Sequence, residues 1–194
     1  MTRAVAWRGV VEWLAEHAVL ELDEDGVRAT GVQLGAEPLP YRLDYRVDAG
    51  GDWATRSLEL QATGAGWHRR LSLRRDQAHA WSFEAAGEGE EGTLGEPGGD
   101  VRAVGDALDC DLAFSPLTNL MPVRRHALHE TTGTQDFVMA LVSVPELRFA
   151  PSTQRYEHLR PGVVRFVSGD FTAELVLDGD GLVLVYPELA ERVD

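Results

Sequence analysis

The sequence predicts an all-β protein of 194 residues, built mostly from antiparallel strands in one curved sheet. Apolar and polar residues alternate through many segments, which is the period of a β-strand. Turn signals recur about every eight to twelve residues, as they do in sandwiches and barrels. Two turns, Asp23–Gly26 and Asp178–Gly181, end in the Asp-Gly pair that hairpins favour. All-β proteins of this length routinely form one domain, so we expect residues 1–194 to fold as one unit.

The strands follow from this alternation, which is clearest in Tyr41–Val47, where apolar and charged residues alternate without a break. We expect strands over Val19–Leu22, Val27–Leu34, Tyr41–Val47, Trp53–Ala62, Trp67–Arg74, His79–Glu84, Gln135–Val144, Val163–Ser168, Phe171–Leu177 and Leu182–Tyr186.

Two stretches interrupt the strands. Ala85–Asp100 is rich in Gly and Glu with little to bury, which predicts a mobile surface loop. Residues 115–125 begin with Ser at a helix N-cap position and Pro at the first helical position, which predicts one short helix. A second helix at the C-terminus is an alternative to a last strand. A faint similarity between the segments on either side of residues 115–125 indicates either an internal duplication or chance likeness between hairpins.

Composition limits the classes of partner. The net charge of −14 disfavours nucleic acids and anionic membrane surfaces. The sequence contains no lysine, which excludes Schiff-base chemistry and a P-loop. No apolar run approaches the roughly 20 residues of a membrane-spanning helix, so we expect no stable membrane insertion. The first residues lack the pattern of a signal peptide, and we expect a cytoplasmic protein.

Three charged residues fall on apolar strand faces. By alternation Glu16, Arg56 and Arg69 are in phase with buried leucines. A buried charge requires a partner or a solvated cavity. The first interpretation is a structural ion pair at a strand end, and the second is a cavity mouth that binds the polar head of an amphiphile.

Polar residues concentrate in the stretch that precedes and forms the expected helix. It runs through Asp109-Cys110-Asp111-Leu112, Ser115-Pro116-Leu117-Thr118-Asn119 and Pro122-Val123-Arg124-Arg125. Taken together in chain order with four others, these motifs resemble the bacterial glycolipid-binding protein family. The four other motifs are Glu16-His17 and Trp53-Ala54-Thr55-Arg56 before this stretch, and Gln154-Arg155-Tyr156 and Tyr186-Pro187 after it. The resemblance implies one highly curved sheet rolled into a half-open barrel, similar in shape to periplasmic carriers of lipidated or glycolipid ligands.

We therefore expect a small amphiphilic, glycolipid-like ligand and no catalysis. The candidate ligand-binding residues are Glu16, Arg56, Asp109, Asp111, Asn119, Arg124 and Tyr156. Leu20, Leu58 and Leu71 would face the apolar part of the ligand.

Other chemistries find weaker support. One alternative is a hydrolase that acts on a sugar-containing substrate through the paired carboxylates Asp109 and Asp111; another is a scaffold protein with a packed interior. We expect no metal and no cofactor, because His126 and His129 lack a third ligand. Cys110 is expected to be a small buried residue and not a nucleophile.

Overall fold

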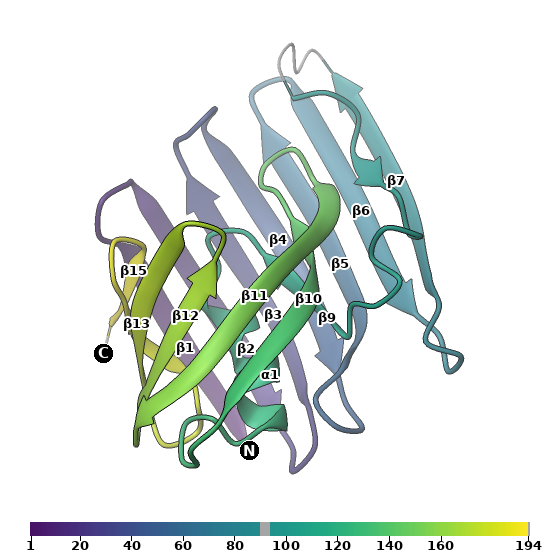
Figure 1. The fold of residues 1–194 in the computed structure, drawn as a ribbon. Coiled ribbons are helices and arrows are strands. Elements are labelled where there is room, and N and C mark those ends of the chain that lie inside the picture. The colour runs from purple at the N-terminus through teal and green to yellow at the C-terminus, as the bar shows by residue number, and fades with distance from the viewer. Residues whose placement is uncertain (90–93, 194) are drawn as a thin grey trace.

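The chain forms one strongly curved sheet, which the computed structural model describes for residues 1–89 and 94–193 (Figure 1). Over these residues the sheet has 15 strands in the order β7-β6-β5-β4-β3-β2-β1-β15-β14-β13-β12-β11-β10-β9, with β8 beside β11. All pairs are antiparallel except β9 with β10 and β8 with β11. The two end strands, β7 and β9, do not pair with each other, so the sheet is not closed into a barrel. The predicted curved antiparallel sheet is confirmed.

The strands and helices have the following bounds. The N-terminal half contains β1 (Thr2–Gly9), β2 (Leu14–Leu22), β3 (Val27–Gly35), β4 (Tyr41–Ala49), β5 (Thr55–Gly64), β6 (Trp67–Arg75) and β7 (Trp81–Gly89). The C-terminal half contains β8 (Gly98–Gly99), β9 (Asp109–Leu112), the 3-10 helix η1 (Pro116–Asn119), α1 (Leu120–Arg125), β10 (Thr134–Val142), β11 (Arg148–Arg160), β12 (Val163–Ser168), β13 (Phe171–Leu177), β14 (Val183–Tyr186) and β15 (Ala190–Val193).

Most of the predicted elements are present. The Asp-Gly turns join β2 to β3 and β13 to β14, and the short helix lies at η1 and α1. The alternative of a C-terminal helix is wrong, because Ala190–Val193 is strand β15, paired with β1. The predicted loop over Ala85–Asp100 is wrong at its start, because Ala85–Gly89 continues β7 beside β6. It is also wrong near its end, because Gly98–Gly99 forms β8 beside β11. Residues 90–93 of that prediction lie outside the described residues.

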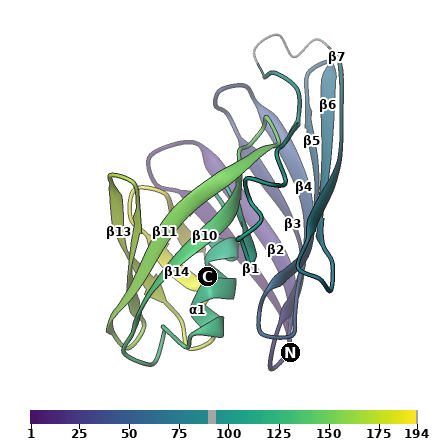
Figure 2. The ribbon, with the colours of Figure 1, turned by 45° about the vertical axis from the view of Figure 1, so that its right-hand side comes forward.

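The curvature brings β9, at one end of the sheet, against the start of β5 in the other half. The amide of Thr55 donates to the carbonyl of Leu108 at 3.1 Å, and its hydroxyl accepts from the amide of Cys110 at 3.1 Å. The helical segment lies in the space between the two halves, as the turned view shows (Figure 2). The interior is therefore partly filled by the chain itself.

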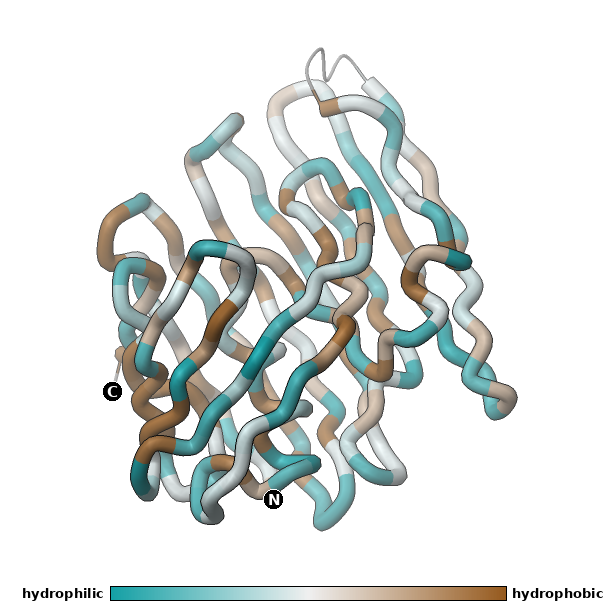
Figure 3. The backbone as a smooth tube through the Cα atoms, in the orientation of Figure 1, coloured by the Kyte–Doolittle hydropathy of each residue, from teal (hydrophilic) through white to brown (hydrophobic). Residues whose placement is uncertain are grey.

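Hydrophobic and hydrophilic residues alternate along many of the strands (Figure 3). In β4 this alternation matches the burial, because every second residue is buried. Leu20, Leu58 and Leu71 are at most 1% exposed and belong to a continuous core that includes residues from both halves. The expectation that these leucines face a ligand is therefore wrong, because their space is filled by other core side chains. Room for a ligand has to lie nearer the surface.

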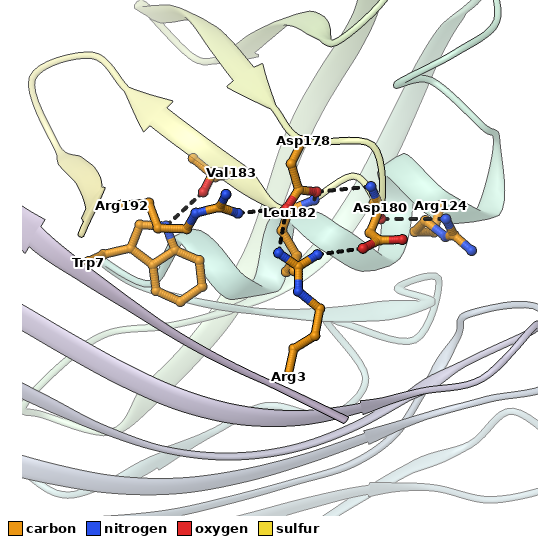
Figure 4. A network of polar contacts seen from close by, with 8 residues as sticks. All are labelled: Arg3, Trp7, Arg124, Asp178, Asp180, Leu182, Val183 and Arg192. Carbon is orange, nitrogen blue, oxygen red and sulfur yellow. Dashed lines mark hydrogen bonds and ion pairs between the residues drawn. The ribbon is translucent and has the colours of Figure 1, made fainter. Parts of the chain in front are cut away.

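The two halves join at the pairing of β1 with β15, and half-buried ion pairs reinforce this seam (Figure 4). Asp178 accepts hydrogen bonds from Arg3 at 3.0 Å and from Arg192 at 2.6 Å. Burial raises the pKa of Asp178, but the Arg192 hydrogen bond and two backbone amides outweigh it and hold the pKa below its usual range. The Trp7 indole donates to the Val183 carbonyl at 2.8 Å and attaches β1 to β14.

Candidate functional site

A pocket of about 400 Å³ opens between the segment 111–119 and the strands β10 to β14. We call it the polar pocket. Its polar lining consists of Asp111, Ser115, Asn119, Ser152, Gln154, Ser168 and Glu188. Its aromatic lining consists of Phe114, Phe166, Phe171 and Tyr186. Hydrogen-bonding groups beside aromatic rings in one concavity are typical of small-molecule sites.

A hydrogen-bonded network orients the polar side chains at the base of the pocket. Thr118 donates to Oδ1 of Asp111 at 2.8 Å, and Gln154 donates to Oδ2 at 2.6 Å. The Tyr156 hydroxyl is 2.9 Å from Oδ1 of Asn119 and 3.3 Å from Oε1 of Gln154, so it can donate to either amide. These contacts hold the carboxyl and the two amides in place before any ligand arrives.

Burial raises the pKa of Asp111, while the hydrogen bonds from Gln154 and Thr118 act in the opposite direction. Both of these donors are neutral. A carboxyl group in this setting accepts hydrogen bonds well and gains from any positive charge that approaches it.

A second carboxyl group, that of Glu16, is fully buried and lies behind the wall of the polar pocket. Its Oε1 accepts hydrogen bonds from Tyr45 at 2.5 Å and from Ser115, itself a lining residue, at 2.7 Å. Its Oε2 is buried and has no hydrogen-bond partner among the described residues. Burial raises the pKa of Glu16 from 4.5 to about 7 despite the two hydroxyl donors.

A glycine allows Tyr45 to reach Glu16. Gly31 lies opposite Tyr45 in the β3–β4 register, and the tyrosine ring covers it. A Cβ at residue 31 would lie 2.3 Å from Cζ of the ring, closer than atoms can approach. Only glycine leaves the space in which this ring lies across β3 and extends its hydroxyl to β2.

An apolar recess of about 220 Å³ adjoins the polar pocket and shares Phe114, Glu188 and Leu189 with it. Its other side chains come mainly from residues 11–14 and 35–37 and from Tyr41. At its rim Trp13 is 65% exposed and Val11 is 73% exposed. Large exposed apolar residues beside a recess mark a contact surface. The polar pocket and the apolar recess together are called the groove below.

The structure brings together four of the seven predicted site residues. Asp111 and Asn119 line the polar pocket. Tyr156, 2% exposed, holds Asn119 from behind, and Glu16 contacts the lining through Ser115. The interpretation of Glu16 as an inward-facing residue is confirmed, since it is 2% exposed.

The predicted inward placement of Arg56 is wrong. The β4–β5 register shifts between Asp48 and Ala49, whose partners are Ser57 and Thr55, so Arg56 is the extra residue of a β-bulge. The bulge reverses the alternation, which buries Thr55 and leaves the Arg56 side chain 60% exposed. Its Nη1 lies 4.0 Å from the Asp48 carboxylate on the outer face, and the residue does not line the groove.

Asp109 lies apart from the polar pocket in a buried ion pair. Arg125 donates to both carboxylate oxygens, at 2.8 and 2.6 Å, and also to the carbonyls of Asp52 and Trp53 at 2.9 Å each. The pair therefore fixes the turn before β5. The paired-carboxylate alternative gains no support from Asp109, because both of its oxygens are occupied by the guanidinium.

Arg124 also lies outside the groove, on the side of the seam (Figure 4). Its guanidinium stacks on the Trp53 ring at 4.8 Å, and Nη1 lies 3.5 Å from the Asp180 carbonyl. Arg69 is fully buried as predicted and donates to the carbonyls of Glu146 and Gly95. These contacts account for both arginines as structural groups.

Cys110 is buried as predicted, and burial raises the pKa of its thiol well above the usual value. Among residues 1–89 and 94–193, no group of three or more His, Cys, Asp or Glu side chains is arranged to hold a metal ion.

The sequence reasoning missed the β11 side of the polar pocket. Ser152 and Gln154 point inward from this strand, and Phe166, Phe171 and Tyr186 complete the wall from β12 to β14. The available signal was the motif Gln154-Arg155-Tyr156, which contributed to the family resemblance but from which only Tyr156 was taken as a candidate.

The comparisons with known proteins agree with this architecture. The family described as "Putative glycolipid-binding" matches residues 4–192. The chain belongs to this family. A solved structure of similar fold is that of a DUF1089 family protein from Pseudomonas aeruginosa. It is 26% identical and has a TM-score of 0.70, and the match covers 96% of this chain and 95% of that chain. No curated protein is detectably similar to the chain in sequence.

For this member of the glycolipid-binding family, none of the helices in the described ranges is long and apolar enough to span a bilayer.

Proposed function

We propose that the protein binds a small amphiphile in the groove, with the polar head in the polar pocket and the apolar chain along the apolar recess. One observation carries the proposal: a pocket of about 400 Å³ with oriented polar groups continues directly into an apolar recess of about 220 Å³. The family description supports the same class of ligand.

The polar pocket suits a head group rich in hydroxyl groups. Asp111 accepts hydrogen bonds, the amides of Asn119 and Gln154 both donate and accept, and the hydroxyls of Ser152 and Ser168 do the same. The neighbouring rings of Phe166 and Phe171, 6.1 Å apart, offer apolar faces for the carbon skeleton of a sugar.

The apolar recess suits an alkyl chain. Trp13 and Val11 present apolar surface to solvent that a chain would cover, and each buried methylene contributes about 0.8 kcal/mol. Of the five tryptophans only Trp13 is substantially exposed; Trp7, Trp53, Trp67 and Trp81 are at most 7% exposed. The fluorescence of Trp13 should therefore respond to binding in this part of the groove.

The test is a fluorescence titration with octyl glucoside below its micelle concentration, with methyl glucoside as the head group alone. Octyl glucoside should shift the tryptophan emission to the blue and saturate, and methyl glucoside should bind far more weakly. Trp13→Phe should lose the shift yet still bind by calorimetry.

Trp13→Ala should weaken binding several-fold, whereas Val193→Ala, which trims an exposed apolar side chain of β15, should not. Absence of saturable binding of octyl glucoside to the folded wild type would contradict the proposal.

A further inference from the structure

Three inward-facing carboxyl groups, the buried Asp109 and Glu16 and the half-buried Asp111, differ in whether a positive charge accompanies them. Asp109 is fully compensated by the two-point contact with Arg125. Within the described residues, Asp111 accepts hydrogen bonds from two side chains, Thr118 and Gln154, and both donors are neutral. Glu16 has only two hydroxyl donors, and its Oε2 has no hydrogen-bond partner among the described residues. Removing a carboxylate from water without a counter-charge is costly, so this pattern needs an explanation.

The groove itself offers no counter-charge. Asp111 and Glu188 line the polar pocket, and Glu12, Glu37 and Glu188 line the apolar recess. Among the described lining residues of either part there is no arginine and no histidine, and the sequence has no lysine. The charged side chains among the described lining residues are therefore all acidic.

From this charge pattern we propose that the polar head bound in the groove carries a protonated amine, so that the natural ligand is a cationic amphiphile. The inference rests on the proposed function and deepens it by assigning the sign of the head group's charge. The ammonium group donates to Asp111 and supplies the counter-charge that this carboxyl lacks. Hydrogen bonds with an ionised partner are roughly twice as strong as neutral ones.

The aromatic wall favours the same charge. The rings of Phe166, Phe171 and Tyr186 lie 6.0–6.2 Å from one another around the polar pocket. The faces of aromatic rings attract cations, which is how many proteins recognise ammonium ligands. A phosphate or carboxylate head would instead meet Asp111 and Glu188 with no basic side chain to offset the repulsion.

A matched series of ligands tests the assignment on the wild-type protein. Octyl glucoside, octyl 2-amino-2-deoxyglucoside and octyl glucuronide share one chain and one ring and differ in a single group that is neutral, cationic or anionic. By calorimetry at neutral pH, the amino glycoside should bind about tenfold or more tightly than octyl glucoside, from one charge-assisted hydrogen bond. The glucuronide should bind more weakly than both.

Two variants test whether Asp111 causes the preference for the amino glycoside. Asp111→Asn keeps the side-chain shape but removes the charge. It should therefore bring the ratio of the affinity for the amino glycoside to the affinity for octyl glucoside close to one. Glu174→Gln removes an exposed carboxylate of β13 outside the groove and should retain the wild-type ratio.

The outcomes separate the two proposals. Equal or weaker binding of the amino glycoside, with octyl glucoside still saturating, overturns the cationic assignment and leaves the amphiphile site standing. No binding of any of the three overturns both. A preference for the amino glycoside that persists in Asp111→Asn also overturns the assignment of the amine to this carboxyl.

Discussion

Replacing Glu16 with Gln should stabilise the protein at alkaline pH and change little in acid. Burial raises the pKa of Glu16 from 4.5 to about 7, so the folded state binds this proton more tightly than the unfolded chain does. The stability that the group contributes is fully present below its unfolded pKa and is lost as the pH rises through about 7. Each tenfold change in proton affinity is worth about 1.4 kcal/mol, so ionisation costs the folded state about 3 kcal/mol at pH 8.

Gln keeps a carbonyl oxygen that can accept from Tyr45 and Ser115, so the variant avoids this cost without losing the network. Urea unfolding of both proteins at pH 4.5 and pH 8 measures the effect. The free-energy gap between Glu16→Gln and wild type should widen by about 3 kcal/mol between the two pH values. Glu21→Gln, the same change on the exposed face of β2, is the matched control. A gap that stays constant between the two pH values would refute the reasoning.

Two further predictions concern stability. Arg125→Met leaves the buried Asp109 carboxylate without its partner and should lower the free energy of unfolding, measured in urea, by about 3–5 kcal/mol. Arg155→Met, which breaks an exposed ion pair, should hardly change it. Equal losses in the two variants would contradict the burial argument. Gly31→Ala places a methyl group 2.3 Å from the Tyr45 ring. It should cost roughly 1–3 kcal/mol, and clearly less in a Tyr45→Ala background; the same cost in both backgrounds would show that the ring is not the cause.

The sequence predicted most of the strands whose inward positions are apolar, although it missed β1, in which Val5 and Trp7 face inward. Tyr41–Val47 is one of the predicted strands, and β4 contains it. The failure at β11 has a physical reason: its inward positions include Ser152 and Gln154, which line the polar pocket. Alternation detects a strand by its apolar face, so the strand that contributes most polar groups to the site was the hardest to detect.

Two errors at the site arise from information that alternation does not contain. Arg56 has the parity of an inward residue, but one extra residue in β5 reverses it. Asp109 and Asp111 are equivalent in a strand pattern. Their different roles depend on which residue of the helical segment reaches each one, Arg125 or Thr118. Contacts between segments that are distant in the sequence determine these partners, and local residue spacing does not.

The seam between β1 and β15 imposes an order on folding during synthesis. Strands β2 to β7 form a run of consecutive hairpins, so that half of the sheet can assemble as it leaves the ribosome. One edge of β1 stays unpaired until β15, made more than 170 residues later, reaches it. An open strand edge recruits other chains. The nascent protein therefore keeps this open edge until β15 has been made.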